Sequence, residues 1–134
     1  MSKIVVRYAP SMRQIDAASW DRLEPYHIGT RHAWLSALEE SATIGPAVGI
    51  GFMIPLLIDG TTGQLLAAAP GSIKNNTRGE YGPENIWISR AEKAGMRLLP
   101  KLQFDTPMTP VAGPRLLTHP AWPRATLCSM LLTA

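Results

Sequence analysis

The stretch Phe52–Ala69 (FMIPLLIDGTTGQLLAAA) decides the fold that the sequence predicts. Two apolar runs, Phe52–Ile58 and Gln64–Ala69, flank the spacer Asp59–Gly63, which has turn residues at both ends. Apolar runs of this length around a short glycine-containing loop are typical of a β-hairpin. The hairpin therefore places β-structure at the centre of the chain.

Helices and strands alternate on both sides of this hairpin. We predict these further elements: a strand at Ile4–Tyr8, helices at Ile15–Glu24 and Arg31–Ser41, a helix from Pro83 to Ala94, a strand at Arg97–Asp105, and a helix at Arg124–Ala134. Thr30 is the predicted N-cap of the second helix. Trp20, Trp34 and Trp87 fall on helical stripes and are predicted to be core residues. The fold class is α/β in the mixed α+β sense, with a mixed, partly antiparallel sheet flanked by helices.

Prolines limit where strands can lie. Pro55 and Pro70 each lack a backbone N–H, so we expect neither hairpin strand to keep an unbroken ladder. Six of the twelve prolines lie between Pro100 and Pro123, so we expect that segment to be extended backbone that is held at the edge of a sheet or splayed from its neighbour.

Length and composition indicate one globular domain, residues 1–134. Hydrophobic residues make up 46% of the 134 and charged residues 17%, enough apolar material for a core. The longest apolar stretch, Ile50–Ile58, is too short to span a membrane, and Arg7 interrupts the region where a signal peptide would be apolar. The lone Cys128 excludes an internal disulfide. These features predict a cytoplasmic protein.

Charge and histidine placement argue against several function classes. The net charge is +3, but the thirteen Lys and Arg residues are scattered, without the basic stripe that DNA binding needs. His27, His32 and His119 are isolated from one another and from paired carboxylates, so we predict neither a metal site nor a catalytic triad. Cys128 lies on the apolar stripe of the last helix and is expected to pack there.

A series of short blocks, in order along the chain, resembles one known family. The blocks are Ile15–Asp21, Leu35–Ser41 with Gly45-Pro46, Leu66–Pro70, Lys74, Gly79–Tyr81, Trp87, Glu92–Gly95, Pro100–Gln103 and Thr109–Leu117. In this order they resemble the N-terminal portion of the FemAB-like predicted N-acyltransferases, which are described as peptidoglycan biosynthesis or recognition proteins. The resemblance implies a partial GNAT-like acyl-CoA N-acyltransferase fold. The chain departs from the family pattern at Gly82-Pro83-Glu84 and at Gly71–Ile73.

The resemblance also implies chemistry that the chain supplies only in part. Family members run far beyond Ala134, so we expect a truncated N-terminal part of an acyltransferase lobe. The donor of the complete family is acyl-CoA or aminoacyl-tRNA, held by a glycine-rich loop that leads from a strand into a helix. The nearest string, Pro46–Gly51, leads instead from a helix into a strand. We therefore expect no donor to bind this chain tightly.

The polar loop before the third predicted helix holds the candidate catalytic residue. Acyl transfer to an amine requires removal of a proton, which the Glu80 carboxylate is suited to accept. Tyr81 is suited to donate to a leaving group, and Lys74 to hold an acidic group of the acceptor. Lys101 and Arg115 match basic positions of the family and are candidate contacts for an anionic substrate. The alternatives are a solvated turn for the loop and edge cations for Lys101 and Arg115.

Two functions remain open at this point. In the first, the chain belongs to an N-acyltransferase that transfers an acyl or aminoacyl group to an amine of a small molecule or cell-wall precursor. In the second, the chain is a non-catalytic remnant or binding module that lacks the donor site. A sheet without its later strands would also have an open edge, which predicts marginal stability or a homo-oligomer.

Overall fold

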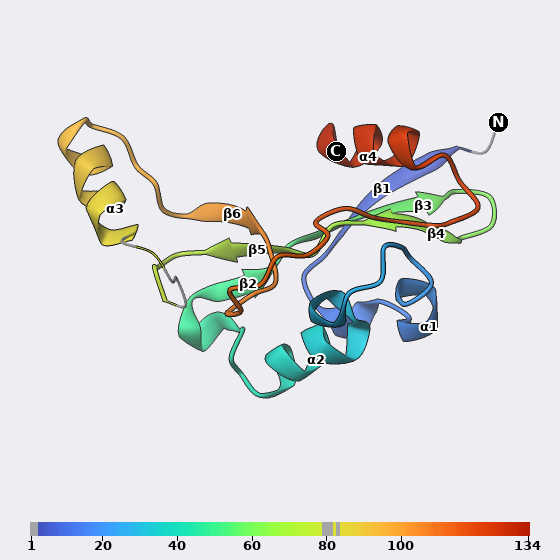
Figure 1. Ribbon diagram of the computed structural model, residues 1–134, viewed down its shortest axis with the longest axis horizontal. Coiled ribbons are helices and arrows are strands. Elements are labelled where there is room, and N and C mark those ends of the chain that lie inside the picture. The colour runs from blue at the N-terminus through green and yellow to red at the C-terminus, as the bar shows by residue number, and fades with distance from the viewer. Residues whose placement is uncertain (1–2, 79–81, 83) are drawn as a thin grey trace.

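Two antiparallel sheets and four helices form the chain, as the computed structural model shows for residues 3–78, 82 and 84–134 (Figure 1). The first sheet has the strand order β1-β3-β4-β7, and the second has the order β2-β5-β6. The strands are β1 (Ile4–Ala9), β2 (Ile50–Phe52), β3 (Ile54–Asp59), β4 (Leu65–Ala68), β5 (Gly71–Lys74), β6 (Lys101–Phe104) and β7 (Leu117–Thr118). The helices are α1 (Ala17–Trp20), α2 (His32–Glu40), α3 (Glu84–Lys93) and α4 (Arg124–Leu132).

The predicted hairpin is confirmed as β3 and β4. The turn between them is organised by Asp59, whose Oδ1 accepts hydrogen bonds from the backbone N–H groups of Thr61 (2.8 Å) and Thr62 (3.1 Å). Gly63 closes the turn at φ 75°, a left-handed conformation that glycine adopts without steric cost. Aspartate and glycine therefore fix this loop for the reasons that the sequence indicated.

Both arms of the hairpin continue beyond β3 and β4 and change partners there. The arm that holds β3 begins in β2, and the arm that holds β4 ends in β5, with Pro55 and Pro70 close to the two junctions. Across the junction, the Met53 N–H donates to the Gly71 carbonyl (2.8 Å). The long arms thus belong to both sheets, which differs from the single mixed sheet that we expected. Proline lacks the donor that a continuous ladder needs, and the strands bend where those donors are missing.

Helices cover both faces of the four-stranded sheet (Figure 1). On one face, α1, α2 and the 3-10 turn Met12–Gln14 build the larger core around fully buried Trp20, Leu35 and Ile54. On the other face, α4 packs Leu127 and Leu131 of its predicted apolar stripe against the sheet, whereas Leu132 of that stripe is exposed. Helix α3 lies apart from both cores, beyond the three-stranded sheet (Figure 1).

The first two helices differ from their predicted bounds. Helix α1 is a single turn, capped by Asp16, whose Oδ2 accepts from the Ser19 N–H (2.8 Å). Helix α2 begins at His32, and Thr30 does not cap it: the Thr30 hydroxyl donates to the His27 carbonyl in a preceding 3-10 turn. The local side chain–backbone bond competes with the capping role that the sequence predicted.

Two of the three tryptophans predicted to be core residues are exposed. Trp20 is buried, and its indole N–H donates to the Thr30 carbonyl (2.7 Å). Trp34 is 39% exposed because the buried stripe of α2 centres on Leu35. Trp87 is 61% exposed because only Ala91 of α3 is buried. A helical stripe in the sequence indicates an amphipathic helix but not whether another element covers it.

The proline-rich segment confirms its predicted edge position. It contains one of the two outer strands of each sheet, β6 beside β5 and β7 beside β4. In the described part of the chain, no helix has both the length and the apolar composition needed to cross a membrane.

Candidate functional site

A cleft of about 230 Å³ lies between the three-stranded sheet and the segment that follows β6. Its described lining consists of Ile50, Ser72, Lys74, Gln103, Asp105, Pro107, Met108, Thr109, Pro110, Val111 and Arg115. The polar lining comes from three places: the end of β5, the end of β6 and the segment before β7. The cleft therefore depends on the hairpin arm that ends in β5, because β6 pairs with that strand.

Lys74 is a buried cation at the end of β5. Only 4% of the residue is exposed, and its Nζ donates to the Arg78 carbonyl oxygen (2.7 Å). Ile50 of β2 lies opposite Lys74 in the register, and Ser72 lies two residues away on the same face. A buried ammonium needs hydrogen-bond acceptors, and this one is held by backbone and placed at the cleft.

Gln103 and Asp105 supply an amide and a carboxylate to the cleft. The Gln103 Nε2 donates to Asp105 Oδ2, which fixes both side chains relative to each other. The Gln103 Oε1 is buried and has no hydrogen-bond partner among the described residues. A buried acceptor without a partner carries an energetic cost that a ligand donor relieves.

Arg115 brings a second cation to the same cleft. It lies just before β7, and its guanidinium donates to the Gly113 carbonyl oxygen (2.8 Å). Lys74 and Arg115 are far apart in the sequence, yet they line one cavity. The lining thus combines two cations with one carboxylate.

Two glycines let the segment after β6 lie close against the 3-10 turn Ile28–Thr30 and its N-cap His27. A Cβ added at Gly29 would lie 2.8 Å from Thr106 Cγ2, and one added at Gly113 would lie 3.1 Å from the His27 ring. The His27 Nδ1 in turn accepts from the Gly29 N–H (3.1 Å). These close contacts hold Thr106 and Gly113, which lie on either side of the cleft-lining residues 107–111.

A sequence model of the FemAB-like family, described as peptidoglycan biosynthesis/recognition, matches residues 11–134. The chain belongs to the FemAB-like family. The matched range includes every described residue that lines the cleft. No curated protein and no solved structure gives a significant match.

The other predicted site residues of this FemAB-like chain are not among the described residues that line the cleft. Lys101 forms an ion pair with Glu84 at the start of α3, outside the described lining of the cleft. Glu80 and Tyr81 lie outside the residues that the structure describes. The structure therefore brings together Lys74 and Arg115 of the predicted set.

Gln103 and Asp105 are polar cleft residues that were not among the site residues predicted from the sequence. The signal for them is the alternation along β6, where Lys101, Gln103 and Asp105 are polar and the two residues between them are apolar. Period-two alternation places alternate residues on one face of a strand. That pattern alone indicated a polar face, without showing that a cleft adjoins it.

The string Pro46–Gly51 of the FemAB-like chain is a packed connection. It runs from a 3-10 turn at Pro46–Val48 into β2. Its amides are used locally, since the Gly49 N–H donates to the Pro46 carbonyl (3.1 Å). Gly49 has φ 68°, and an added Cβ would lie 2.6 Å from the Asn76 side chain. Backbone conformation and close packing explain this glycine without a bound phosphate.

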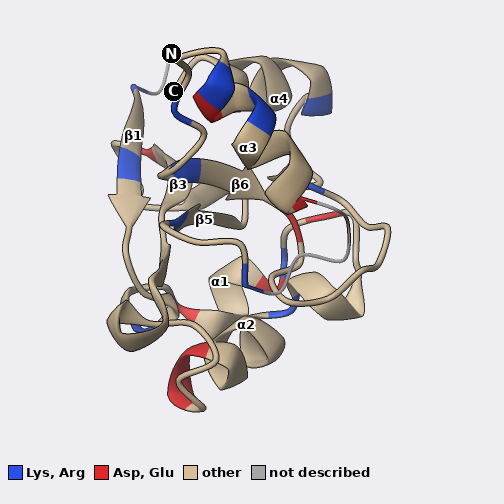
Figure 2. Cartoon of the chain, turned by 90° about the vertical axis from the view of Figure 1, so that its left-hand side faces the viewer, with Lys and Arg blue, Asp and Glu red and all other residues tan. Residues whose placement is uncertain are grey.

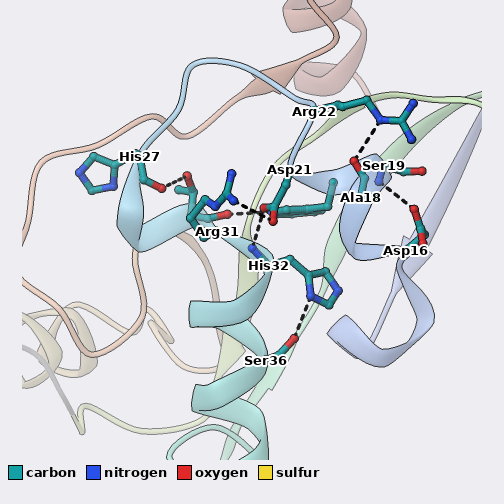
Figure 3. Close-up of polar contacts among 11 residues, drawn as sticks. Asp16, Ala18, Ser19, Asp21, Arg22, His27, Arg31, His32 and Ser36 are labelled. Carbon is teal, nitrogen blue, oxygen red and sulfur yellow. Dashed lines mark hydrogen bonds and ion pairs between the residues drawn. The ribbon is translucent and has the colours of Figure 1, made fainter.

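His32 has a structural role between α1 and α2 (Figure 3). Its Nε2 lies 2.8 Å from the Ile15 carbonyl oxygen, so this nitrogen carries a proton and donates. Its Nδ1 lies 3.2 Å from the Ser36 hydroxyl, and its backbone N–H donates to Asp21 Oδ1. Asp21 also pairs with Arg31 (3.3 Å). Among the described residues, no three His, Cys, Asp or Glu side chains gather at metal-ligand spacing.

Proposed function

We propose that this FemAB-like chain binds the amine acceptor of an N-acyltransferase that transfers an acyl or aminoacyl group to a cell-wall precursor. Family membership supports the peptidoglycan-related part of the proposal. The acyltransferase chemistry and the GNAT-like relationship rest on the resemblance of the sequence blocks described above.

The charge pattern of the cleft is the observation that carries this proposal. An acceptor derived from a cell-wall peptide carries both carboxylates and an amine. Lys74 and Arg115 offer cations to its carboxylates, and Asp105 offers an anion to its ammonium group. Hydrogen bonds between charged partners are stronger than neutral ones, so this lining favours an amino-acid-like group over an uncharged one.

In the proposed reaction, a carboxylate of the chain takes a proton from the acceptor ammonium. The freed nitrogen lone pair then forms a bond to the acyl carbon, and the bond from that carbon to the donor's leaving group breaks. Asp105 lies in the cleft where such an ammonium would bind. Glu80 remains the residue that the sequence predicts for this proton transfer.

A second candidate is a binding module that recognises the acceptor without transferring a group to it. The local use of the Pro46–Gly51 amides favours it, because a pyrophosphate loop needs free N–H groups. Titration with acetyl-CoA distinguishes the two candidates. Saturable micromolar binding of acetyl-CoA to this chain would exclude the module.

Calorimetric titration with the peptide L-alanyl-γ-D-glutamyl-L-lysine tests the acceptor site. We expect saturable binding to the unaltered chain and at least roughly tenfold weaker binding to Arg115→Gln, because a charge-assisted bond is lost. Asp105→Asn should weaken binding of the amine in the same range. Arg13→Gln is the matched control, since Arg13 is exposed and outside the cleft. Equal affinity in Arg115→Gln and Arg13→Gln would refute the proposed site.

A further inference from the structure

The outward face of α3 combines large apolar side chains with cations. Ile86 is 52% exposed and Trp87 61% exposed, while Arg90 and Lys93 are also exposed. These four residues follow the three- and four-residue spacing that places side chains on one side of a helix. The Arg90 guanidinium lies 5.9 Å from the centre of the Trp87 ring, so cation and aromatic side chain are adjacent.

The acidic residues of α3 lie away from this face. Glu84 turns to the sheet, where it pairs with Lys101. Glu92 lines a shallow hollow with Ile88 and the turn that follows the helix. Glu92 is two positions from Arg90, a spacing that does not place side chains on one face of a helix. The outward face is thus apolar and basic, without a carboxylate among its described residues.

Helix α3 also stands at one end of the molecule. Figure 1 shows it beyond the three-stranded sheet, and Figure 2 shows it facing the viewer at that end, with basic residues on it. Met96 and Leu98, which follow the helix, are also exposed (59% and 41%), and Arg97 between them adds a cation. A flat partner can therefore reach the helix and the turn together.

We propose that this face of α3 is a peripheral contact site for an anionic lipid bilayer. Helices that lie at a bilayer surface carry tryptophan and aliphatic residues for the headgroup boundary and Lys or Arg for anionic lipids. The face defined by Ile86, Trp87, Arg90 and Lys93 has both components.

Charge also argues against a second copy of the chain as the occupant. A two-fold symmetric dimer through this face would place the same patch on both subunits. Two patches that each carry Arg90 and Lys93 and no described carboxylate would then face each other, and like charges at short distance repel. An anionic surface instead complements these cations. The contact is independent of acceptor binding, because it shares no residue with the cleft.

Co-sedimentation with vesicles tests this proposal. We expect the unaltered chain to bind vesicles of equal parts phosphatidylcholine and phosphatidylglycerol, and to stay in solution with phosphatidylcholine alone. The double variant Arg90→Gln, Lys93→Gln should bind about twenty-five-fold less, since each cation near an anionic surface contributes roughly fivefold. Arg13→Gln with Arg22→Gln is the matched control, because both residues are exposed and flank α1 in the sequence, and Figure 1 shows α1 far from α3. Equal losses in the two double variants would overturn the proposal.

Tryptophan fluorescence locates the contact. Anionic vesicles should shift the emission to shorter wavelength, and Trp87→Phe should abolish most of this shift while Trp34→Phe keeps it. A shift that survives Trp87→Phe would place the contact elsewhere and overturn the proposal. Sedimentation equilibrium without lipid gives the remaining outcome: a dimer that Trp87→Ala dissociates would assign this face to a second copy, again overturning it.

Discussion

Gly71→Ala tests the junction at which the hairpin passes from one sheet to the other. A Cβ at Gly71 would lie 2.4 Å from the Met53 carbonyl oxygen and 2.8 Å from the Phe104 ring. The Phe104 side chain is 38% exposed and can turn aside. The Met53 carbonyl belongs to the backbone of the neighbouring arm and can move only if the junction opens. Overpacking of this kind costs about 1–3 kcal/mol of the free energy of unfolding.

Gly51→Ala is the matched control on the same sheet. Gly51 lies in β2, opposite Ile73, and an added Cβ there meets no atom within 4 Å. Alanine at an unstrained position restricts the unfolded chain and stabilises a protein by about 0.4–1 kcal/mol. Gly71→Ala and Gly51→Ala should therefore change stability in opposite directions.

Urea unfolding followed by circular dichroism measures both changes. Gly71→Ala should lower the midpoint at an unchanged slope, and the thermal midpoint should fall by roughly 4 °C per kcal/mol. Equal shifts for the two variants would refute the junction as a site of close backbone approach. A lower stability for Gly51→Ala alone would refute the register of the three-stranded sheet.

Three further changes test other parts of the chain. Leu127→Ala should lower the free energy of unfolding by about 2–5 kcal/mol, measured by urea unfolding, because the fully buried leucine joins α4 to the sheet; a change below about 1 kcal/mol would contradict that packing. Asp16→Asn should reduce the dependence of the free energy of unfolding on pH in the acid range. Hydrogen bonds from Ser19 hold the pKa of Asp16 below its ordinary value of 3.8. The ionised carboxylate therefore contributes fully to stability above that value, and this contribution is lost as the pH falls through the lower, folded-state pKa. An unchanged dependence of the free energy of unfolding on acid pH in Asp16→Asn would argue against this cap. Glu80→Gln, in an active protein that carries the same Gly-Glu-Tyr, should reduce the rate about a hundredfold if Glu80 is the general base; a loss below roughly threefold would assign Glu80 to a solvated turn.

The sequence predicted most of the secondary structure because its signals are local. The Asp59 turn, the presence of the hairpin and the last two helices follow from turn residues and from apolar spacing within short windows. Helix α1 begins two residues later than expected because the Asp16 side chain caps it, and it ends after a single turn at Trp20, four residues before the predicted Glu24. Such competition between neighbouring polar groups changes boundaries but not the order of the elements.

The division into two sheets required information that the sequence pattern does not contain. Pro55 and Pro70 predicted broken ladders, but a missing donor does not specify which strand pairs on each side of the break. Trp87 shows the same limit for burial: its helical spacing is equally consistent with a covered and an uncovered face. The cleft likewise depends on contacts between distant segments. The family resemblance could therefore identify Lys74 and Arg115 as candidates one by one, but it could not predict that they line the same cleft.

The shared hairpin implies a gradient of local stability along the molecule. Its β3–β4 half lies between two helical layers, whereas its β2–β5 half is bordered by the short edge strand β6. Backbone amides should accordingly exchange with solvent slowest in β3 and β4 and fastest in β6. Local opening of β6 would release Gln103 and the adjoining wall of the cleft while both buried cores stay intact. The fold thereby separates the part that maintains the native state from the part that can rearrange around a ligand.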